Sequence, residues 1–242
     1  MEPLRLQSEV AVDDWQESGR GGPLVAVNCS SGVSAASEFR FLMNHALSAA
    51  SGGAEVLYYR QRPVAAPDFL LDVAKLADRP SKAMRMLRRI SFQYATGSKS
   101  LLDKLASLTS TLHRQPCPDV VIVEGLDCLC SPSCTSESVA VLAALTDAAN
   151  WILAHRRRRR WCSSGAAAPV PVLASSRFDF SVAASVIGAR AMELTTSVES
   201  GGATSLLLRD GQRLWTADSE GRAMTETPAT TDRQPPPSSA EL

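Results

Sequence analysis

The 242-residue sequence predicts an α/β fold in which a mostly parallel sheet is flanked by helices and followed by a C-terminal antiparallel meander. Short apolar runs alternate with segments of helical period, as in chains that join strands by crossover helices. The run VVIV at 120–123 is uninterrupted, which is typical of a parallel strand buried on both faces, so we place it at the sheet centre. Near the end of the chain, Asp210-Gly211 is a strong hairpin signal between two short strands.

The expected elements alternate along the chain between two polar ends. Strands are expected at 24–27, 56–59, 90–94, 120–123, 171–174, 192–194, 205–209 and 213–216. Helices are expected at 35–50, 68–78, 80–89, 99–113 and 137–155. Residues 1–22 and 222–242 are polar and rich in small residues or proline, which cannot build a core. We therefore expect two disordered tails around one domain at 23–221.

Composition and charge exclude several classes of function. The 25 lysines and arginines balance the 25 aspartates and glutamates, so nucleic-acid binding requires a local patch rather than a basic coat. The six cysteines are unevenly spaced and no secretion signal precedes them, which indicates a reduced, intracellular setting. The longest apolar stretch, 139–154, is interrupted by Asp147 and Asn150 and is short for a bilayer, so we expect a soluble protein without membrane contact.

Residues 29–37, CSSGVSAAS, follow the first strand and precede a helix, which is the place of a phosphate-binding loop. In such a loop, backbone N–H groups and the helix N-terminus bind phosphate oxygens, a lysine bridges the β- and γ-phosphates, and a hydroxyl holds Mg²⁺. Here Gly32 supplies one tight position, Ser34 stands at the second glycine, and Ala35 replaces the lysine. The candidate nucleotide-binding residues are Ser31, Gly32, Val33, Ser34, Ala35, Ala36 and Ser37. Taken alone, the degenerate motif favours the alternative, an ordinary β–α turn.

A carboxylate, Glu124, ends the apolar strand at 120–123. A Walker-B strand needs a carboxylate at this place, because it holds a magnesium-bound water at the C-terminal edge of the sheet. Glu124 is therefore the candidate catalytic residue, and Glu124 and Ser37 are the candidate Mg²⁺ ligands if a nucleotide binds. The alternative is a strand-end acid in water, because this pattern also occurs by chance in α/β proteins.

One local basic cluster follows the long helix. It consists of Arg156, Arg157, Arg158, Arg159 and Arg160, with Trp161 directly after them. Arginines beside an aromatic ring suit a nucleic-acid backbone and a stacked base, so the cluster is a candidate patch for DNA or a protein partner. The alternative is a helix end where the helix dipole favours cations. A crossover helix runs antiparallel to its strands, so we expect the cluster at the sheet edge opposite the phosphate loop.

The cysteine and histidine patterns support neither a zinc site nor a hydrolytic triad. The cysteines within 128–134 have no matching second pair, so we interpret them as ordinary thiols. His45, His113 and Ser175 form no nucleophile, base and acid order that supports triad chemistry.

Three stretches are together similar to one family. VLYYRQRP at 56–63, RRISFQYATGSKSLLDKLASL at 88–108 and DVVIVEGLDCL at 119–129 resemble the SWIM-type-zinc-finger-associated proteins, the small RecA-like recombinase paralogues of animal Shu complexes. The similarity runs from about 24 to 174. Its most telling parts are the Arg-x-Pro that follows the second strand and the strand ISFQY.

The resemblance implies a RecA-like P-loop NTPase core with ATP and Mg²⁺ as cofactors. It also implies pairing with a SWIM-type zinc-finger protein, binding of single-stranded DNA, and support of RecA-class recombinases or their paralogues in homologous recombination repair of double-strand breaks in the nucleus. By position, the family's phosphate loop falls on 29–37 and its Walker-B tip on Glu124. The DNA-facing loops fall near 128–136 and 175–179.

The chemistry of the family is incomplete in this chain. Ala35 removes the cation that neutralises the β- and γ-phosphates, and no glutamate to activate water follows the second strand, where Arg60, Gln61 and Arg62 stand. We therefore expect a binding subunit with a degenerate ATP site that binds nucleotide weakly or not at all. The alternatives are an ATPase stimulated by single-stranded DNA, in which Arg40 replaces the lysine, and an α/β interaction scaffold unrelated to recombination.

Overall fold

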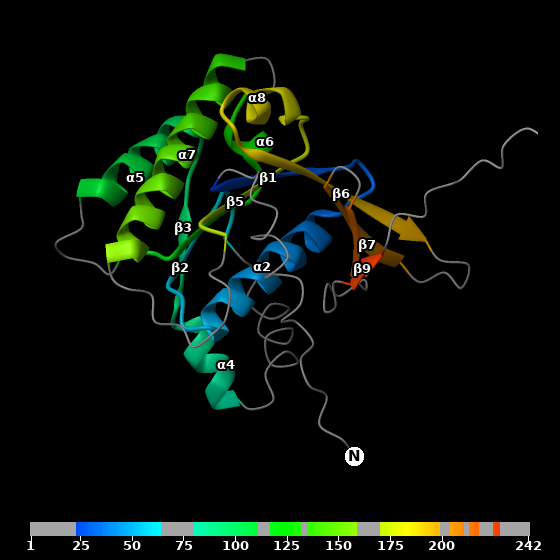
Figure 1. The fold of residues 1–242 in the computed structure, drawn as a ribbon, viewed down its shortest axis with the longest axis horizontal. Helices are drawn as coiled ribbons and strands as arrows, with labels where there is room; N and C mark the ends of the chain where they lie inside the picture. Colours follow the sequence, from blue (N-terminus) through cyan, green and yellow to red (C-terminus); the bar gives the residue numbers. More distant parts are fainter. Residues whose placement is uncertain are drawn as a thin grey trace, which may run out of the picture.

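The computed structural model describes residues 23–63, 80–110, 117–131, 135–158, 170–198, 204–210, 213–217 and 225–227. Within these residues, one sheet holds nine strands in the order β3-β2-β4-β5-β1-β6-β7-β8-β9 (Figure 1). The strands are β1 (Leu24–Cys29), β2 (Val56–Arg60), β3 (Ile90–Tyr94), β4 (Val120–Val123), β5 (Val172–Ser176), β6 (Arg190–Val198), β7 (Thr204–Asp210), β8 (Arg213–Ala217) and β9 (Thr225–Thr227).

The first six strands pair in parallel, and β6 to β9 form an antiparallel meander. This is the predicted α/β architecture, a mostly parallel sheet flanked by helices and followed by an antiparallel meander. Strand β1 lies between β5 and β6, so the loop that follows it meets the carboxyl ends of neighbouring parallel strands.

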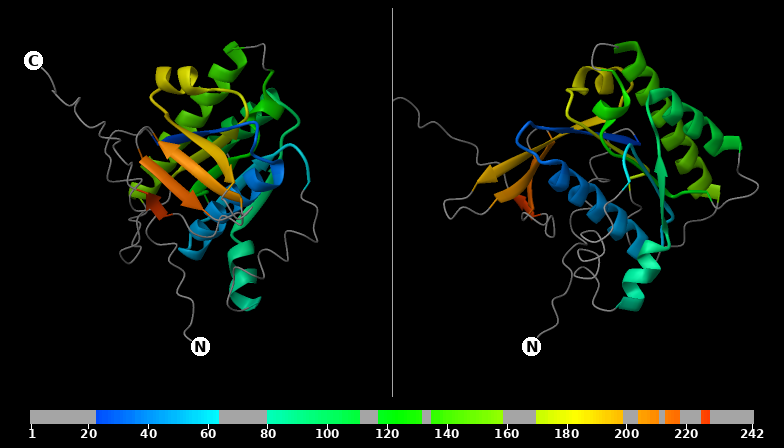
Figure 2. Two further views of the ribbon diagram at one scale, coloured as in Figure 1. Left: turned by 90° about the vertical axis from the view of Figure 1, so that its right-hand side faces the viewer. Right: turned by 180° about the vertical axis from the view of Figure 1, so that it is seen from behind.

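Helices cover both faces of the sheet, as the view from behind in Figure 2 shows. They are α2 (Ala35–Ser51), α4 (Pro80–Leu87), α5 (Ser98–Ser110), α6 (Leu126–Leu129), α7 (Thr135–Arg158) and α8 (Ser181–Val186). Helices α2 and α4 pack on one face, and α5, α7 and α8 pack on the other. The chain leaves β1 toward one face and leaves β4 and β5 toward the other. In open α/β sheets, ligands bind in the crevice at such a switch of direction.

Two apolar clusters, one on each face of the sheet, form the core. One cluster joins Leu42 of α2 to Ile122 of β4, and the other joins Val123 of β4 to Leu145 of α7. Each fully buried side chain of this size contributes about 1.5–3 kcal/mol to folding. The side chains of β4 are thus buried on both faces, between β2 and β5, which confirms the burial predicted from the VVIV run, although β1 is the middle strand of the nine.

Most predicted elements are confirmed, with ends shifted by a few residues. The expected strand at 192–194 extends to Arg190–Val198, because pairing with β1 and β7 continues the strand beyond its apolar residues. Helices α6 and α8 were not expected, since four and six residues are too short to show a clear period. The expected helix at 68–78 and the expected tail at 1–22 lie outside the described residues.

Strand β9 corrects the prediction of a tail at 222–242. Its three residues pair with β8 in antiparallel register, so the prediction is wrong for Thr225–Thr227. The composition of this stretch gave no sign of a strand, because a partner strand rather than apolar side chains supplies the stabilising contacts.

Helix α7 is long and apolar enough, by length and composition alone, to cross a membrane over Ser136–Arg156. The apolar stretch at 139–154, which was expected to be short for a bilayer, lies within this helix, and the helix predicted at 137–155 extends over Thr135–Arg158. Its side chains Leu142, Leu145 and Ile152 pack in the core cluster against the sheet. This packing is that of a core helix in a globular domain.

Candidate functional site

The loop after β1 is held tightly against strand β6. The backbone N–H of Ser30 donates to the carbonyl of Leu194 at 2.9 Å, and the N–H of Val33 donates to the carbonyl of Ser30 at 3.0 Å. The Val33 side chain is buried in the core. A Cβ at Gly32 would lie 3.0 Å from Oγ1 of Thr196, so glycine permits this close approach. The loop therefore occupies the predicted place of a phosphate loop, in a conformation fixed by the sheet.

Two serines organise the first turn of α2. The Oγ of Ser34 caps the helix by accepting the Ser37 backbone N–H at 3.0 Å, and the two hydroxyl oxygens lie 2.8 Å apart. The side chains of Ala35 and Ala36 are exposed at the helix start. The expected hydroxyl ligand, Ser37, is thus hydrogen bonded to Ser34, and no cation stands at the lysine position.

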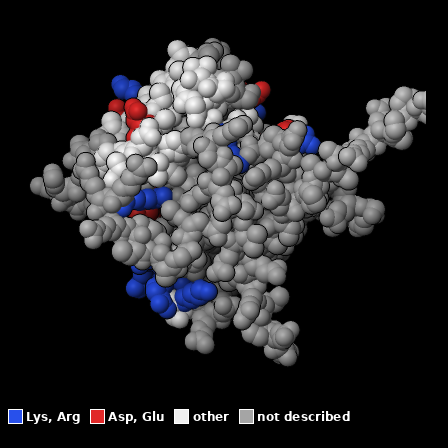
Figure 3. Space-filling view, viewed as in Figure 1, with Lys and Arg blue, Asp and Glu red and all other residues white. Residues whose placement is uncertain are grey.

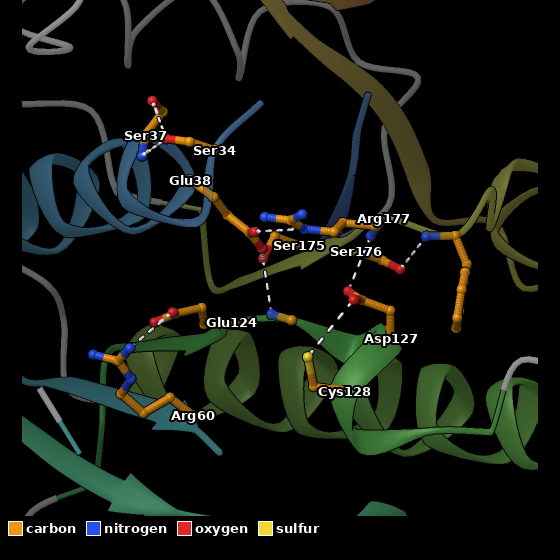
Figure 4. A network of polar contacts seen from close by, with 12 residues as sticks. Ser34, Ser37, Glu38, Arg60, Glu124, Asp127, Cys128, Ser175, Ser176 and Arg177 are labelled. Carbon is orange, nitrogen blue, oxygen red and sulfur yellow. Dashed lines mark hydrogen bonds and ion pairs between the residues drawn. The ribbon is translucent and has the colours of Figure 1, made fainter. Parts of the chain in front are cut away.

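A buried carboxylate, Glu38, lies below this first turn and links three elements (Figure 4). Only 4% of the surface of Glu38 is exposed to solvent. The Ser175 hydroxyl at the end of β5 donates to Oε1 of Glu38 at 2.5 Å, and the Gly125 N–H donates to the Ser175 Oγ at 3.0 Å. The Arg177 Nε lies 3.7 Å from the other oxygen of Glu38. The network therefore joins α2 to β5 and to the turn after β4.

The protein environment changes the pKa of Glu38. Burial is the main cause and raises the pKa of the carboxyl above its ordinary value, and the charge of Asp127 adds to this effect. The hydrogen bond from Ser175 and the charge of Arg177 act in the opposite direction without reversing it.

Glu124 lies at the tip of β4 as predicted, but its carboxylate is already engaged. Tyr58 Oη donates to Oε2 at 2.9 Å, and Arg60 Nη2 donates to Oε1 at 3.1 Å. The Arg60 guanidinium also lies 4.8 Å from the centre of the Phe39 ring. Burial raises the pKa of Glu124, while Arg60 and Tyr58 lower it less strongly. Both oxygens of the candidate Mg²⁺ ligand thus have protein partners.

The two loops implied to face DNA lie side by side at this edge. The Arg177 N–H after β5 donates to Oδ1 of Asp127 in α6 at 3.0 Å, and Gln61 Nε2 donates to the Cys128 carbonyl at 3.1 Å. Cys128 is exposed, whereas Cys130 is buried in the core, so their side chains are in different environments. Residues 132–134 of the first loop lie outside the described residues.

Arg156 corrects the prediction of a continuous basic patch at 156–161. Its residue is buried, and its Nη2 donates to the backbone carbonyl of Asp119. Because Asp119 directly precedes β4, the end of α7 lies at the edge opposite the phosphate loop, as expected. The side chains of Arg157 and Arg158 and all of 159–161 lie outside the described part of the chain. Arg156 therefore has a structural role and is not part of an exposed patch.

The residues at the loop do not fit ATP with Mg²⁺, the cofactors that the family implies. Ala35 supplies no positive charge for the phosphates, and the acidic side chain of Glu38 in the same helix turn repels them when it is ionised. Ser37 and Glu124, the candidate Mg²⁺ ligands, are bound to other side chains. Among the residues that the structure describes, no group of three or more His, Cys, Asp or Glu side chains is placed to hold a metal ion.

Several residues of this site were not predicted from the sequence. They are Glu38 and Tyr58, while Arg60, Ser175 and Arg177 were named without the contacts that they make here. A signal for Glu38 was present, since its spacing from Leu42 and Ala46 places it on the apolar face of α2. The alternation in β2 likewise places Tyr58 and Arg60 on one face.

Comparison of the chain with protein-family models finds no match, and comparison with curated proteins finds none either.

Proposed function

We propose that the chain is a RecA-like recombinase-paralogue subunit with a degenerate ATP site. It pairs with a SWIM-type zinc-finger protein, binds single-stranded DNA and supports a RecA-class recombinase or its paralogues in homologous recombination repair of double-strand breaks in the nucleus. The RecA-like fold supports this proposal. The three stretches that resemble the family also support it, since they fall on β2, on β3 with α5, and on β4 with α6.

The observation that carries the proposal is the pairing of Ala35 with a buried Glu38 at the start of α2. A P-loop places a cation and free N–H groups at this point, whereas this chain places a methyl group and a carboxylate there. Phosphate charge beside Glu38 is unfavourable unless that carboxyl is protonated. The arrangement therefore favours a subunit that acts by binding partners.

The same carboxylate gives the edge of the sheet a fixed geometry. The bonds from Ser175 to Glu38 and from Gly125 to Ser175 tie α2, β4 and β5 together through the chain's own side chains. Gly125 adopts a left-handed conformation, with φ of 66°, that allows the turn after β4. A site that is already ordered loses less entropy when a macromolecular partner binds.

The geometry gives less support to an active ATPase. Arg40, which would have to replace the lysine, is exposed and lies five residues beyond Ala35 on α2. Five residues correspond to a rotation of about 500° around the helix, so the two positions face different directions. Glu124 is held by Tyr58 and Arg60.

The proposal is tested by producing the full chain together with its candidate SWIM zinc-finger partner. We expect the two proteins to co-elute and the complex to bind single-stranded DNA. Phosphate release from ATP should stay at background in the wild type and be equal in a Glu124→Gln variant. Absence of both co-elution and DNA binding contradicts the proposal, and hydrolysis that Glu124→Gln abolishes would establish the ATPase instead.

A further inference from the structure

The two edges of the parallel sheet differ in charge. The edge at the carboxyl ends of the strands holds Glu38, Glu124, Asp127 and Asp179, and its paired cations Arg60 and Arg177 face carboxylates. At the opposite edge, basic residues dominate. They are Lys82, Arg85, Arg88, Arg89 and Arg156, beside Glu55 and Asp119. A polyanion is therefore favoured at the edge remote from the phosphate loop.

Helix α4 presents one exposed stripe at this basic edge. Ser81, Met84 and Arg85 of α4 are exposed, and so is Arg88 directly after the helix, whose N–H still donates to the Met84 carbonyl at 3.1 Å. Their spacings of three and four residues place them on one face. The opposite face of the helix packs into the core through Met86. Figure 3 shows Lys and Arg side chains gathered over the position of α4, at the lower end of the molecule.

The two arginines of this stripe, Arg85 and Arg88, differ from the neighbouring Arg89, which has an acidic partner. Arg89 is held in place, since its Nη1 donates to Oε1 of Glu55 and to the Gly53 carbonyl, both at 2.7 Å. Arg85 and Arg88 have no acidic partner among the residues that the structure describes. Their guanidinium groups are therefore available to bind an external anion.

A chain of contacts links α4 to the end of α7. Arg89 binds Glu55, the Glu55 N–H donates to Oδ2 of Asp119 at 2.9 Å, and the Asp119 carbonyl accepts from Arg156. The arginine run that begins at Arg156 thus starts at the same edge as α4. The buried Arg156 anchors this edge of the sheet. The exposed Arg85 and Arg88 remain to contact a ligand.

We propose that Arg85 of α4 and Arg88 directly after it, with the exposed Met84 beside them, bind the phosphate backbone of single-stranded DNA. The inference rests on the proposed function and adds a location for DNA binding. This location is at the edge of the sheet opposite the loops that the family resemblance implies to face DNA. Guanidinium groups one helical turn apart match successive phosphates of a flexible strand. Met84, at 52% exposure, supplies an apolar contact for an unstacked base or sugar.

The test is the salt dependence of single-stranded DNA binding by the full chain in complex with its zinc-finger partner. An Arg85→Gln/Arg88→Gln variant removes two charges from the stripe. A Lys99→Gln/Lys104→Gln variant removes two charges from α5 and serves as the matched control. We expect the first variant to bind more weakly and to lower the slope of log affinity against log salt by about 1.4, since each phosphate contact contributes about 0.7. The control should leave the slope unchanged.

The outcomes separate this inference from the proposed function. If the wild-type complex binds DNA and the stripe variant binds with the same slope, the location on α4 is wrong and the proposed function stands. If the wild-type complex forms but binds no DNA, both the location and DNA binding by the subunit are wrong. If the stripe variant loses co-elution with the zinc-finger protein instead, the stripe is a protein interface. Circular dichroism confirms that each variant is folded.

Discussion

The hydroxyl of Ser175 donates to the carboxylate of Glu38 across 2.5 Å, joining the end of β5 to the first turn of α2. The two residues are 137 positions apart in the sequence, and both are buried. At the same time, the Ser175 oxygen accepts the Gly125 N–H from the turn after β4. One hydroxyl thus holds together the three elements that surround the site.

Replacement of Ser175 by alanine should destabilise the fold. The change leaves the Gly125 N–H without its acceptor and Glu38 without its closest donor, in a buried setting. An unsatisfied buried group costs about 1–3 kcal/mol, so the free energy of unfolding should fall by that amount. Urea denaturation measures the change. Ser91→Ala, on an exposed strand position, is the control, with an expected change of less than about 0.5 kcal/mol.

The protonation of Glu38 should make stability depend on pH in a defined direction. Its folded-state pKa is raised above the ordinary value of 4.5, so the folded state holds the proton more tightly than the unfolded state does. The stability that the carboxyl contributes is therefore fully present below pH 4.5 and is lost as the pH rises through the raised pKa. Glu38→Gln keeps an acceptor for Ser175 and removes this titration.

The measurement is the difference in unfolding free energy between the wild type and Glu38→Gln across pH 4.5 to 8. We expect the variant to gain stability relative to the wild type as the pH rises. The comparison cancels the titrations of other groups, such as His45. Burial, and secondarily the charge of Arg156, lowers the pKa of His45 to about 4. A difference that does not change with pH would contradict the assignment of a raised pKa to Glu38.

The contact between Arg60 and Glu124 should matter more for stability than for catalysis. The two side chains are only 15% and 14% exposed, so Glu124→Ala leaves a mostly buried guanidinium without its acidic partner. We expect a loss of about 1–3 kcal/mol in Glu124→Ala and a smaller loss in Glu124→Gln, whose amide oxygen still accepts from Tyr58. Thermal unfolding ranks the variants. Equal melting temperatures in all three proteins would show that the contact contributes nothing.

Arg156 should behave differently from the arginines that follow it. Its buried guanidinium donates to the Asp119 carbonyl, so Arg156→Ser should cost about 2–3 kcal/mol of stability. A variant with serine at 157–160 should keep its stability if those arginines act as a binding patch. Denaturation of the two variants side by side tests this difference. Affinity capture with the 157–160 variant then reports on binding without a folding defect.

Most of the fold was predictable because each strand from β1 to β8 carries its own local signal, whereas β9 carries none. The VVIV run identified β4 and its burial on both faces, and the carboxylate at its tip located Glu124 at the correct edge. The contacts of the site were not predictable in the same way, since Glu38 and Ser175 come from separate elements whose distance depends on strand order. Strand order is not encoded in any single period of the sequence.

Arg156 illustrates a second limit. In the sequence it is one of five equal arginines, and only the packing of α7 against the start of β4 makes it a buried donor. Glu38 is the converse case. A charged residue on an apolar helix face is itself a signal of a buried polar contact, although its partner is identified only in the folded structure.

The central claim is that this chain works by binding partners, independently of nucleotide. The most direct test is the affinity of the full chain, in complex with the proposed SWIM zinc-finger partner, for single-stranded DNA with and without ATP and Mg²⁺. The account predicts a stable complex that binds the DNA with the same affinity in both conditions, together with background phosphate release. DNA binding that requires ATP and Mg²⁺, accompanied by hydrolysis, would contradict it.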